Sequence, residues 1–318
     1  MKRDNKIGST KIGEFGIRAE ALPDSAPPEV DDSAPHEAAA PASLARTFLH
    51  NRMGAIGLVL LIGVALFSFL GPHLYQTNQI NTNIAEAHLA PSWQHPLGTD
   101  QVGYDILGRL MVAGQSSLIV GFSAAILASF LGTLWGAIAG YCGGWVDAVM
   151  MRVVDSFLSI PPLLLALVLA SVYKPTIPVL IVVLALLSWL VTARVVRGEA
   201  LSLRVRDFVR AARFFGSRER YIVRRHILPN IIGSIAVLVT LSAADAILLL
   251  AALSYLGLGP PPPAANWGEM LANGLNYAFD GFWWLVYPAG ILIVVTVVAI
   301  NLIGDALREA FDVRLQQR

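Results

Sequence analysis

Long runs of apolar residues alternate with short polar segments along most of the chain. Six runs are near the length of about 20 residues that an α-helix needs to cross roughly 30 Å of hydrocarbon. The predicted spans are residues 53–70, 116–140, 156–173, 177–196, 227–256 and 283–303. Only helices and closed barrels satisfy every backbone group in lipid, so the pattern predicts an all-α membrane protein with six transmembrane helices.

Two of the spans depart from a simple helix. The third contains Pro161 and Pro162, which cannot donate backbone hydrogen bonds and are expected to kink or start a helix. The fifth is longer than a crossing requires, so it either tilts or begins as an interfacial helix. The sequence shows no internal repeat, the signature of many secondary transporters.

Composition agrees with a membrane protein and narrows the chemistry. The 318 residues are 55% hydrophobic and 14% charged, whereas soluble domains are about a quarter charged. Cys142 is the sole cysteine, which excludes a disulfide framework and a thiolate metal cluster. The histidines show no metal-binding spacing, so no metal site is predicted. Residues 1–45 are basic and then rich in Ala, Pro, Asp and Glu, and are expected to form a disordered tail.

Lysine and arginine are distributed unevenly between the two sides of the predicted spans. With the N-terminus in the cytoplasm, 21 of the 23 basic residues lie inside, and only Arg109 and Lys174 lie outside. The positive-inside rule therefore predicts that both termini are cytoplasmic. Two loops, residues 71–115 and 257–282, are then left outside.

The inside loop between the fourth and fifth spans has the densest charge, with ten arginines and three acids in residues 194–225. An apolar stripe at helical spacing is formed by Phe208, Ala211, Ala212 and Phe215. Gly216 suits the left-handed position just after a helix. The sequence thus predicts a helix–turn–helix outside the bilayer, whose stripe is covered by lipid, by the chain's own spans or by a cytoplasmic partner.

The same loop resembles the signature loop of ABC-importer permeases, in which Glu-Ala-Ala precedes a Gly and an Ile-x-Leu-Pro. Here Arg210-Ala211-Ala212 is followed after three residues by Gly216 and, after nine more, by His226-Ile227-Leu228-Pro229. Arg210 stands in place of the usual Glu, and His226 in place of the usual Ile. From about residue 46 to residue 313, the chain is similar to the C-type permease subunit of dipeptide and oligopeptide ABC importers, in stretches such as HPLGTDQVGYDILGRL, SYLGLG and NWGEML.

The resemblance implies a type I ABC-importer permease fold and a heteromeric machine in the bacterial plasma membrane. The implied partners are a second homologous permease, two cytoplasmic ABC ATPases, an extracytoplasmic substrate-binding protein and membrane lipid, but no nucleic acid. The expected organisation is an N-terminal transmembrane helix (46–72), an extracytoplasmic loop (73–115), a five-helix core (116–311) with a coupling loop (197–226), and a tail (312–318). The residues expected to couple to the ATPase are Asp207, Phe208, Arg210, Ala211, Ala212, Phe215 and Gly216.

The chain is not expected to be an enzyme by itself. A phosphate-binding loop needs Lys followed by Ser or Thr, and none of the four lysines has that neighbour. The chain is therefore expected to hold no cofactor, and ATP with Mg²⁺ is expected in the partner subunits. Motifs of intramembrane enzymes, His-Glu-x2-His and Gly-x-Ser-x-Gly, do not occur.

A few polar residues are candidates for contact with cargo or with the binding protein. Asp245 lies within the fifth span, where a carboxylate usually faces a cavity or a partner; a helix–helix hydrogen bond is the alternative. Asp100, Asp105 and Trp267 in the outer loops are candidate contacts of the binding protein, and loop folding explains the two acids equally well. The resemblance implies di- or oligopeptides as cargo. Nickel chelates, glutathione or oligosaccharides are alternatives, and an ATP-independent secondary transporter is a remote one.

Overall fold

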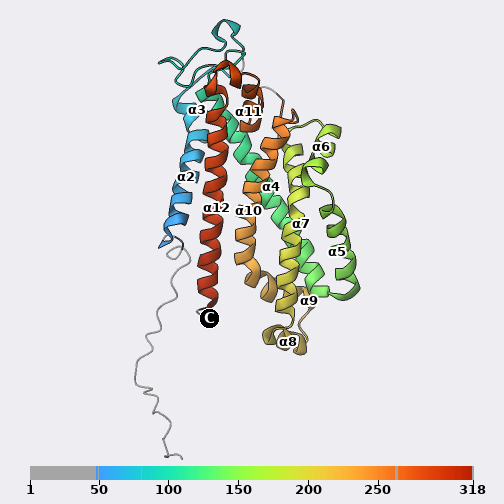
Figure 1. Cartoon of the computed structure of the whole chain (residues 1–318). Helices are drawn as coiled ribbons and strands as arrows, with labels where there is room; N and C mark the ends of the chain where they lie inside the picture. Colours follow the sequence, from blue (N-terminus) through green and yellow to red (C-terminus); the bar gives the residue numbers. More distant parts are fainter. Residues whose placement is uncertain (1–47, 49, 80, 262–263, 317–318) are drawn as a thin grey trace, which may run out of the picture. The chain divides into compact units, whose positions relative to one another are not determined.

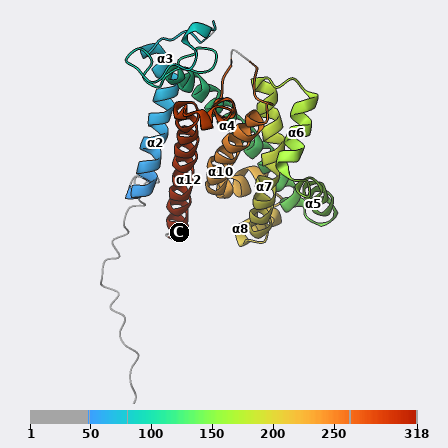
Figure 2. The same ribbon diagram turned by 45° about the horizontal axis from the view of Figure 1, so that its top comes forward.

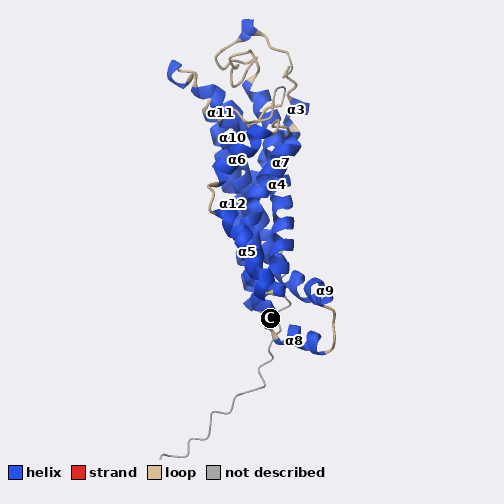
Figure 3. Cartoon of the chain, turned by 90° about the vertical axis from the view of Figure 1, so that its right-hand side faces the viewer, coloured by secondary structure: helices blue, strands red, loops and turns tan. Residues whose placement is uncertain are grey.

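The computed structural model describes residues 48, 50–79, 81–261 and 264–316, which are predominantly helical (Figure 1, Figure 3). The α-helices are α2 (Arg52–Phe69), α3 (Gly71–Leu74), α4 (Ile106–Cys142), α5 (Gly144–Leu158), α6 (Pro162–Val172), α7 (Ile177–Arg204), α8 (Asp207–Phe214), α9 (Glu219–Ile222), α10 (Leu228–Tyr255), α11 (Trp267–Leu275) and α12 (Tyr287–Gln316). Shorter turns are η1 (Ile84–Glu86), the π-helical η2 (Val223–Ile227), η3 (Ala278–Asp280) and η4 (Trp283–Leu285). No strand occurs in these residues, which confirms the all-α prediction. The expected tail, residues 1–45, lies outside them.

Five helical stretches in this part of the chain are long and apolar enough to cross a membrane. They are α2, α4, α7, the run from η2 through α10, and the run from η4 into α12. A sixth crossing is formed if α5 and α6 are counted as one broken span, because the two helices are bent by 83° at their junction. The predicted number of six spans therefore holds only with this broken one.

The broken span has a local cause in the sequence. α5 ends at Leu158, and Pro161 and Pro162 start α6, because proline suits the first turn of a helix but not its interior. The predicted span 156–173 is wrong at its start, since α5 begins at Gly144. Hydropathy missed α5 because only one stripe of it is buried, formed by Asp147, Met151 and Val154.

Two predicted boundaries of the long helices also need correction. α4 has 37 residues and begins at Ile106, so the outer loop ends before the expected residue 115. Polar side chains hide these first turns from a hydropathy search, but Arg109 is buried and Gln115 donates to the carbonyl oxygen of Ser68 at 2.9 Å. α7 continues to Arg204, so the first residues of the expected coupling loop 197–226 belong to a span.

α4 packs closely and extensively against α7. Gly132, Gly136 and Gly140 lie on one face of α4 at four-residue spacing. A Cβ atom on Gly132 or Gly140 would lie 2.6 Å from the carbonyl oxygen of Trp189 or Arg197, respectively, on α7. The two backbones thus touch without side chains between them, as in the small-residue packing of membrane helices.

The remaining helices flank this pair. α2 packs against α12 and α4, whereas α5 packs against α4 and α7 and α6 packs against α7. Figure 2 shows α2 and the α5–α6 pair on opposite sides of α10. α8 and α9 extend from one end of the helices, here named the α8 end, and the long loop with α11 lies at the other, here named the loop end (Figure 1).

Candidate functional site

The helix–turn–helix at the α8 end forms as the sequence predicts. α8 ends at Phe214, and Gly216 adopts a positive φ of 77°. Ser217 N–H donates to the carbonyl oxygen of Ala212, and Gly216 N–H donates to that of Arg213, which is the Schellman arrangement that ends many helices. Because nothing lies within 4 Å of a Cβ added to Gly216, the backbone conformation alone requires glycine there.

The expected cover by the chain's own spans is found for part of the apolar stripe: Ala212 packs against a buried cluster of the chain, whereas the phenylalanines of the stripe are exposed. Phe208 is 43% exposed and Phe215 is 83% exposed, and neighbouring Phe214 is 87% exposed. The side chain that α8 buries completely is Val209, which the stripe omitted. Helical periodicity identifies an apolar face, but the short α8 carries apolar residues on two faces, and only packing shows which one is covered.

Val209 anchors α8 to the ends of the spans. It belongs to a buried cluster with Ile222 of α9, Ile227 of η2, and Val196 of α7. Arg213 adds polar contacts, since its Nη2 lies 3.2 Å from the Tyr141 hydroxyl and its Nε lies 3.6 Å from Glu219. One face of the segment therefore packs against α4, α7 and α10, and the other face carries exposed phenylalanine side chains.

The turn η2 connects this segment directly to α10. Its π-helical geometry inserts an extra residue per turn, a feature that is frequent at functional sites in helices. His226 within it contacts the rings of Phe208 and Tyr221, with centroids 6.1 and 6.0 Å apart. The helix–turn–helix is thus joined to α10 by one short, non-standard turn.

Asp245 lies on an exposed face of α10. Its carboxylate has no hydrogen-bond or ion-pair partner among the described residues, so the alternative of a helix–helix hydrogen bond within this chain is not observed. An open cavity of about 650 Å³ lies on the same face, between α7, α10 and α12. Leu241 borders this cavity one helical turn before Asp245. The carboxylate thus lies just beyond the cavity toward the loop end.

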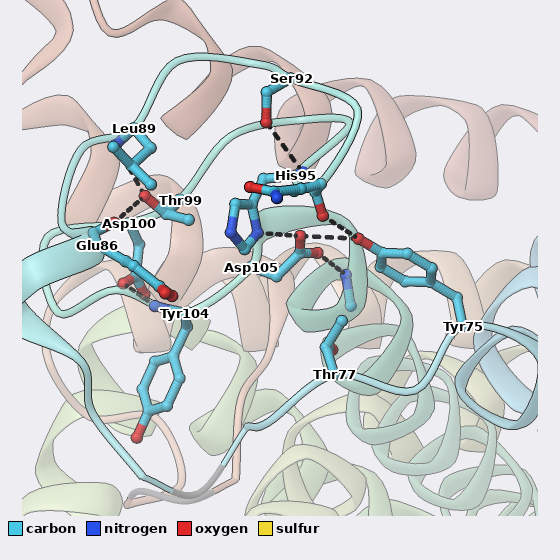
Figure 4. Close-up of polar contacts among 12 residues, drawn as sticks. Tyr75, Thr77, Glu86, Leu89, Ser92, His95, Thr99, Asp100, Tyr104 and Asp105 are labelled. Atoms are coloured by element: carbon cyan, nitrogen blue, oxygen red, sulfur yellow. Dashed lines mark hydrogen bonds and ion pairs between the residues drawn. The ribbon is translucent and has the colours of Figure 1, made fainter.

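The two acids predicted to contact a binding protein are buried at the loop end (Figure 4). Asp105 caps α4: its Oδ1 accepts from Gly108 N–H at 2.8 Å, and its Oδ2 lies 2.9 Å from His95 Nδ1 and accepts from the Tyr75 hydroxyl at 3.0 Å. Asp100 accepts from the backbone N–H groups of Val102 and Tyr104, at 2.9 and 2.8 Å. Both carboxylates are thus used to fold the loop, which is the alternative that the sequence left open.

Trp267, the third expected contact, is also buried. Its indole Nε1 donates to the carbonyl oxygen of Leu110 at 3.0 Å, which ties α11 to α4. Two other aromatic side chains of the loop end, Trp93 and Phe279, are almost fully exposed. The sequence search missed them because isolated aromatic residues in loops form no periodic pattern.

Ionisable groups at the loop end reflect this burial. Burial and the hydrogen bond to Asp105 together raise the pKa of Tyr75 to about 12. Burial also raises the pKa of the Glu269 carboxyl, an effect that the nearby Arg109 opposes. No group of three or more His, Cys, Asp or Glu side chains in the described part of the chain is placed to hold a metal ion.

Comparison with known proteins accounts for most of the chain. The family described as binding-protein-dependent transport system inner membrane component matches residues 132–317, and the N-terminal TM domain of oligopeptide transport permease C matches residues 42–91. A Brucella suis protein provisionally named a peptide permease is 45% identical over 280 residues, 86% of this chain and 91% of the relative.

Two relatives from Bacillus subtilis carry more specific names. The oligopeptide transport system permease protein OppC is 36% identical, over 85% of this chain and 88% of the relative. The dipeptide transport system permease protein DppC is 34% identical, over 86% of this chain and 85% of the relative. The chain therefore belongs to the family of binding-protein-dependent transport system inner membrane components, and it is a multi-pass permease component of a bacterial ABC transporter.

Proposed function

We propose that the chain forms half of the translocation path of an ATP-driven peptide importer, and that α8 docks in a groove of a separate ATPase. The observation that carries the proposal is the exposure of Phe208, Phe214 and Phe215 on a segment whose other face is fixed to the spans. A hydrophobic face of this kind on a short helix fits a hydrophobic groove of a partner. ATP and Mg²⁺ bind in that partner, and this chain holds neither.

The proposed orientation places the α8 end in the cytoplasm. Ten arginines lie between residues 194 and 225, at this end of the helices. The positive-inside rule supports a cytoplasmic position for so dense a cluster. Both chain termini are then cytoplasmic, and the loop end faces the binding protein.

The proposed partners are a second permease subunit, two ABC ATPases and an extracytoplasmic substrate-binding protein. The names of the relatives support peptides as cargo. The exposed Trp93 and Phe279 are proposed contacts for the binding protein, in place of the buried acids. Asp245 and the adjoining cavity on α10 are proposed to face the path between the two permeases.

The test is purification of the tagged subunit from its own membranes in mild detergent, followed by mass spectrometry of the associated proteins. We expect a second permease and ATPases with phosphate-binding loops. The double variant Phe214→Ser, Phe215→Ser is expected to lose the ATPases and to keep the second permease. Phe279→Ser, which changes an equally exposed aromatic at the other end, is the matched control and should keep both.

Two results would contradict the proposal. A homo-oligomer without any ATPase would favour an ATP-independent transporter. An intact complex that imports nickel chelates, glutathione or oligosaccharides and no peptide would leave the machine correct and the cargo wrong.

A further inference from the structure

The cavity between α7, α10 and α12 has a largely apolar wall. On α10 the lining residues Asn230, Ser234, Leu238 and Leu241 recur every three or four residues, so they share one helix face. Val191 and Val195 of α7 complete this wall. The volume of about 650 Å³ is within the range of roughly 300–1,000 Å³ that is typical of small-molecule sites.

Two opposite charges line this cavity from different helices. Glu199 belongs to α7 and is half-buried, and it lines the cavity together with Ser234 of α10. Arg308 belongs to α12, where its guanidinium group has no ion-pair or hydrogen-bond partner among the described side chains. Glu199 and Arg308 do not form an ion pair with each other.

Arg308 is exposed and Glu199 is half-buried, so both charged groups are accessible to a ligand in the cavity. A ligand with one cationic end, one anionic end and apolar groups between them matches all three properties of the cavity. A short peptide with free termini has this chemistry. A chelated metal or a neutral oligosaccharide does not offer both charges.

We propose that this cavity is a binding site of the permease for short peptides, in which Glu199 binds the α-ammonium group and Arg308 binds the α-carboxylate. Peptide side chains then lie on the wall formed by the valines of α7 and the leucines of α10. The inference rests on the proposed import of peptides and adds a selective site within the membrane subunit, separate from the binding protein.

The test measures equilibrium binding of three probes to the purified permease–ATPase complex without the binding protein. The probes are leucyl-leucine, its N-acetyl derivative and its C-terminal amide. For the wild-type complex, we expect each modification to weaken binding about tenfold, the cost of losing one charge-assisted hydrogen bond of about 1.4 kcal/mol. Glu199→Gln should abolish the penalty for acetylation and keep the penalty for amidation. Arg308→Gln should do the reverse.

Asp305→Asn is the matched control, because it removes a neighbouring exposed charge of α12 that does not line the cavity. It should preserve both penalties. Unchanged penalties in Glu199→Gln and Arg308→Gln, or no binding of leucyl-leucine to the wild-type complex, would overturn the inference.

ATP-driven uptake with the binding protein present separates the two proposals. If the wild-type complex imports peptides while the penalties do not depend on Glu199 and Arg308, only this inference fails. If the wild-type complex imports no peptide, the proposed function fails as well.

Discussion

The guanidinium group of Arg197 in α7 donates two hydrogen bonds to the carboxylate of Asp147 in α5, with Nε–Oδ1 and Nη2–Oδ2 distances of 2.5 and 2.6 Å. This paired geometry is specific to arginine and carboxylate. It fixes the first turn of α5 to α7, whereas most of α5 is exposed in the isolated chain. The pair therefore holds the α5 half of the broken span in place.

Arg197→Lys should lower the stability of the detergent-solubilised complex by about 1–3 kcal/mol, because lysine cannot form the two-point contact. The measurement is the shift of the thermal unfolding midpoint. Arg194→Lys is the control: Arg194 contacts Asp155 at 2.5 Å, but both side chains are about half exposed, and such pairs contribute less than about 1 kcal/mol. Equal shifts in the two variants would contradict a special role of the Asp147 pair.

Gly136→Ala should separate α4 from α7, because the added Cβ would overlap the carbonyl oxygen of Ala193. We expect a loss of about 1–3 kcal/mol, as for other overpacked cores. Gly63→Ala in α2 is the control, since nothing lies within 4 Å of its added Cβ. The measurement is the thermal unfolding midpoint of both variants. A Gly136→Ala protein as stable as Gly63→Ala would show that α4 and α7 can move apart without a loss of stability.

Gly216→Val should block transport while the protein stays in the membrane, because a β-branched residue is strained at a φ of 77°. The assay is ATP-driven uptake, with the amount of protein in the membrane measured in parallel. Gly198→Ala is the matched control: its Cβ also meets nothing within 4 Å, but Gly198 has no positive φ. Normal uptake by Gly216→Val would contradict a coupling role of the turn at Gly216.

Asp245→Asn should reduce uptake several-fold if the carboxylate contacts cargo, and Asp245→Glu should restore part of it, because only the second variant keeps the charge. Initial uptake rates at several peptide concentrations are the measurement. Unchanged rates with Asp245→Asn would assign the residue to packing against the second permease.

Stability should depend on alkaline pH through Tyr75. In the unfolded chain its hydroxyl loses a proton near the ordinary pKa of 10, whereas the folded chain keeps it to about pH 12. The folded state therefore binds more protons in this window, and stability falls as the pH rises through it. Thermal midpoints measured across the window should decline less steeply for Tyr75→Phe than for the wild type. Equal declines of the thermal midpoint in the variant and the wild type would exclude Tyr75 as a cause of the pH dependence.

The sequence predicts those parts of the fold that long apolar runs or backbone geometry determine. Five spans follow from hydropathy, and Gly216 follows from the need for a left-handed residue after α8. α5 escapes detection because Asp147 is buried through its distant partner Arg197, which no local hydropathy window contains. The first turns of α4 escape detection because hydropathy scores Arg109 as exposed, whereas the folded loop buries it beside Asp100.

Residue roles were harder to predict than helices. Asp100 and Asp105 look like surface acids in the sequence, and only the folded loop shows that their oxygens accept backbone and side-chain hydrogen bonds. Conversely, Phe214 and Val209 are both apolar, and only packing shows that one is exposed and the other buried. The cavity also joins α7, α10 and α12, which are distant in sequence.

The break between α5 and α6 has a consequence for the surroundings that this stretch of the chain can have. The carbonyl groups of Ser159 and Ile160 accept no hydrogen bond from the described residues, and both residues are exposed. Lipid cannot satisfy such groups, so another protein surface or water must cover them. The break therefore excludes this short stretch of the chain from direct contact with hydrocarbon, although apolar helices lie on both sides of it.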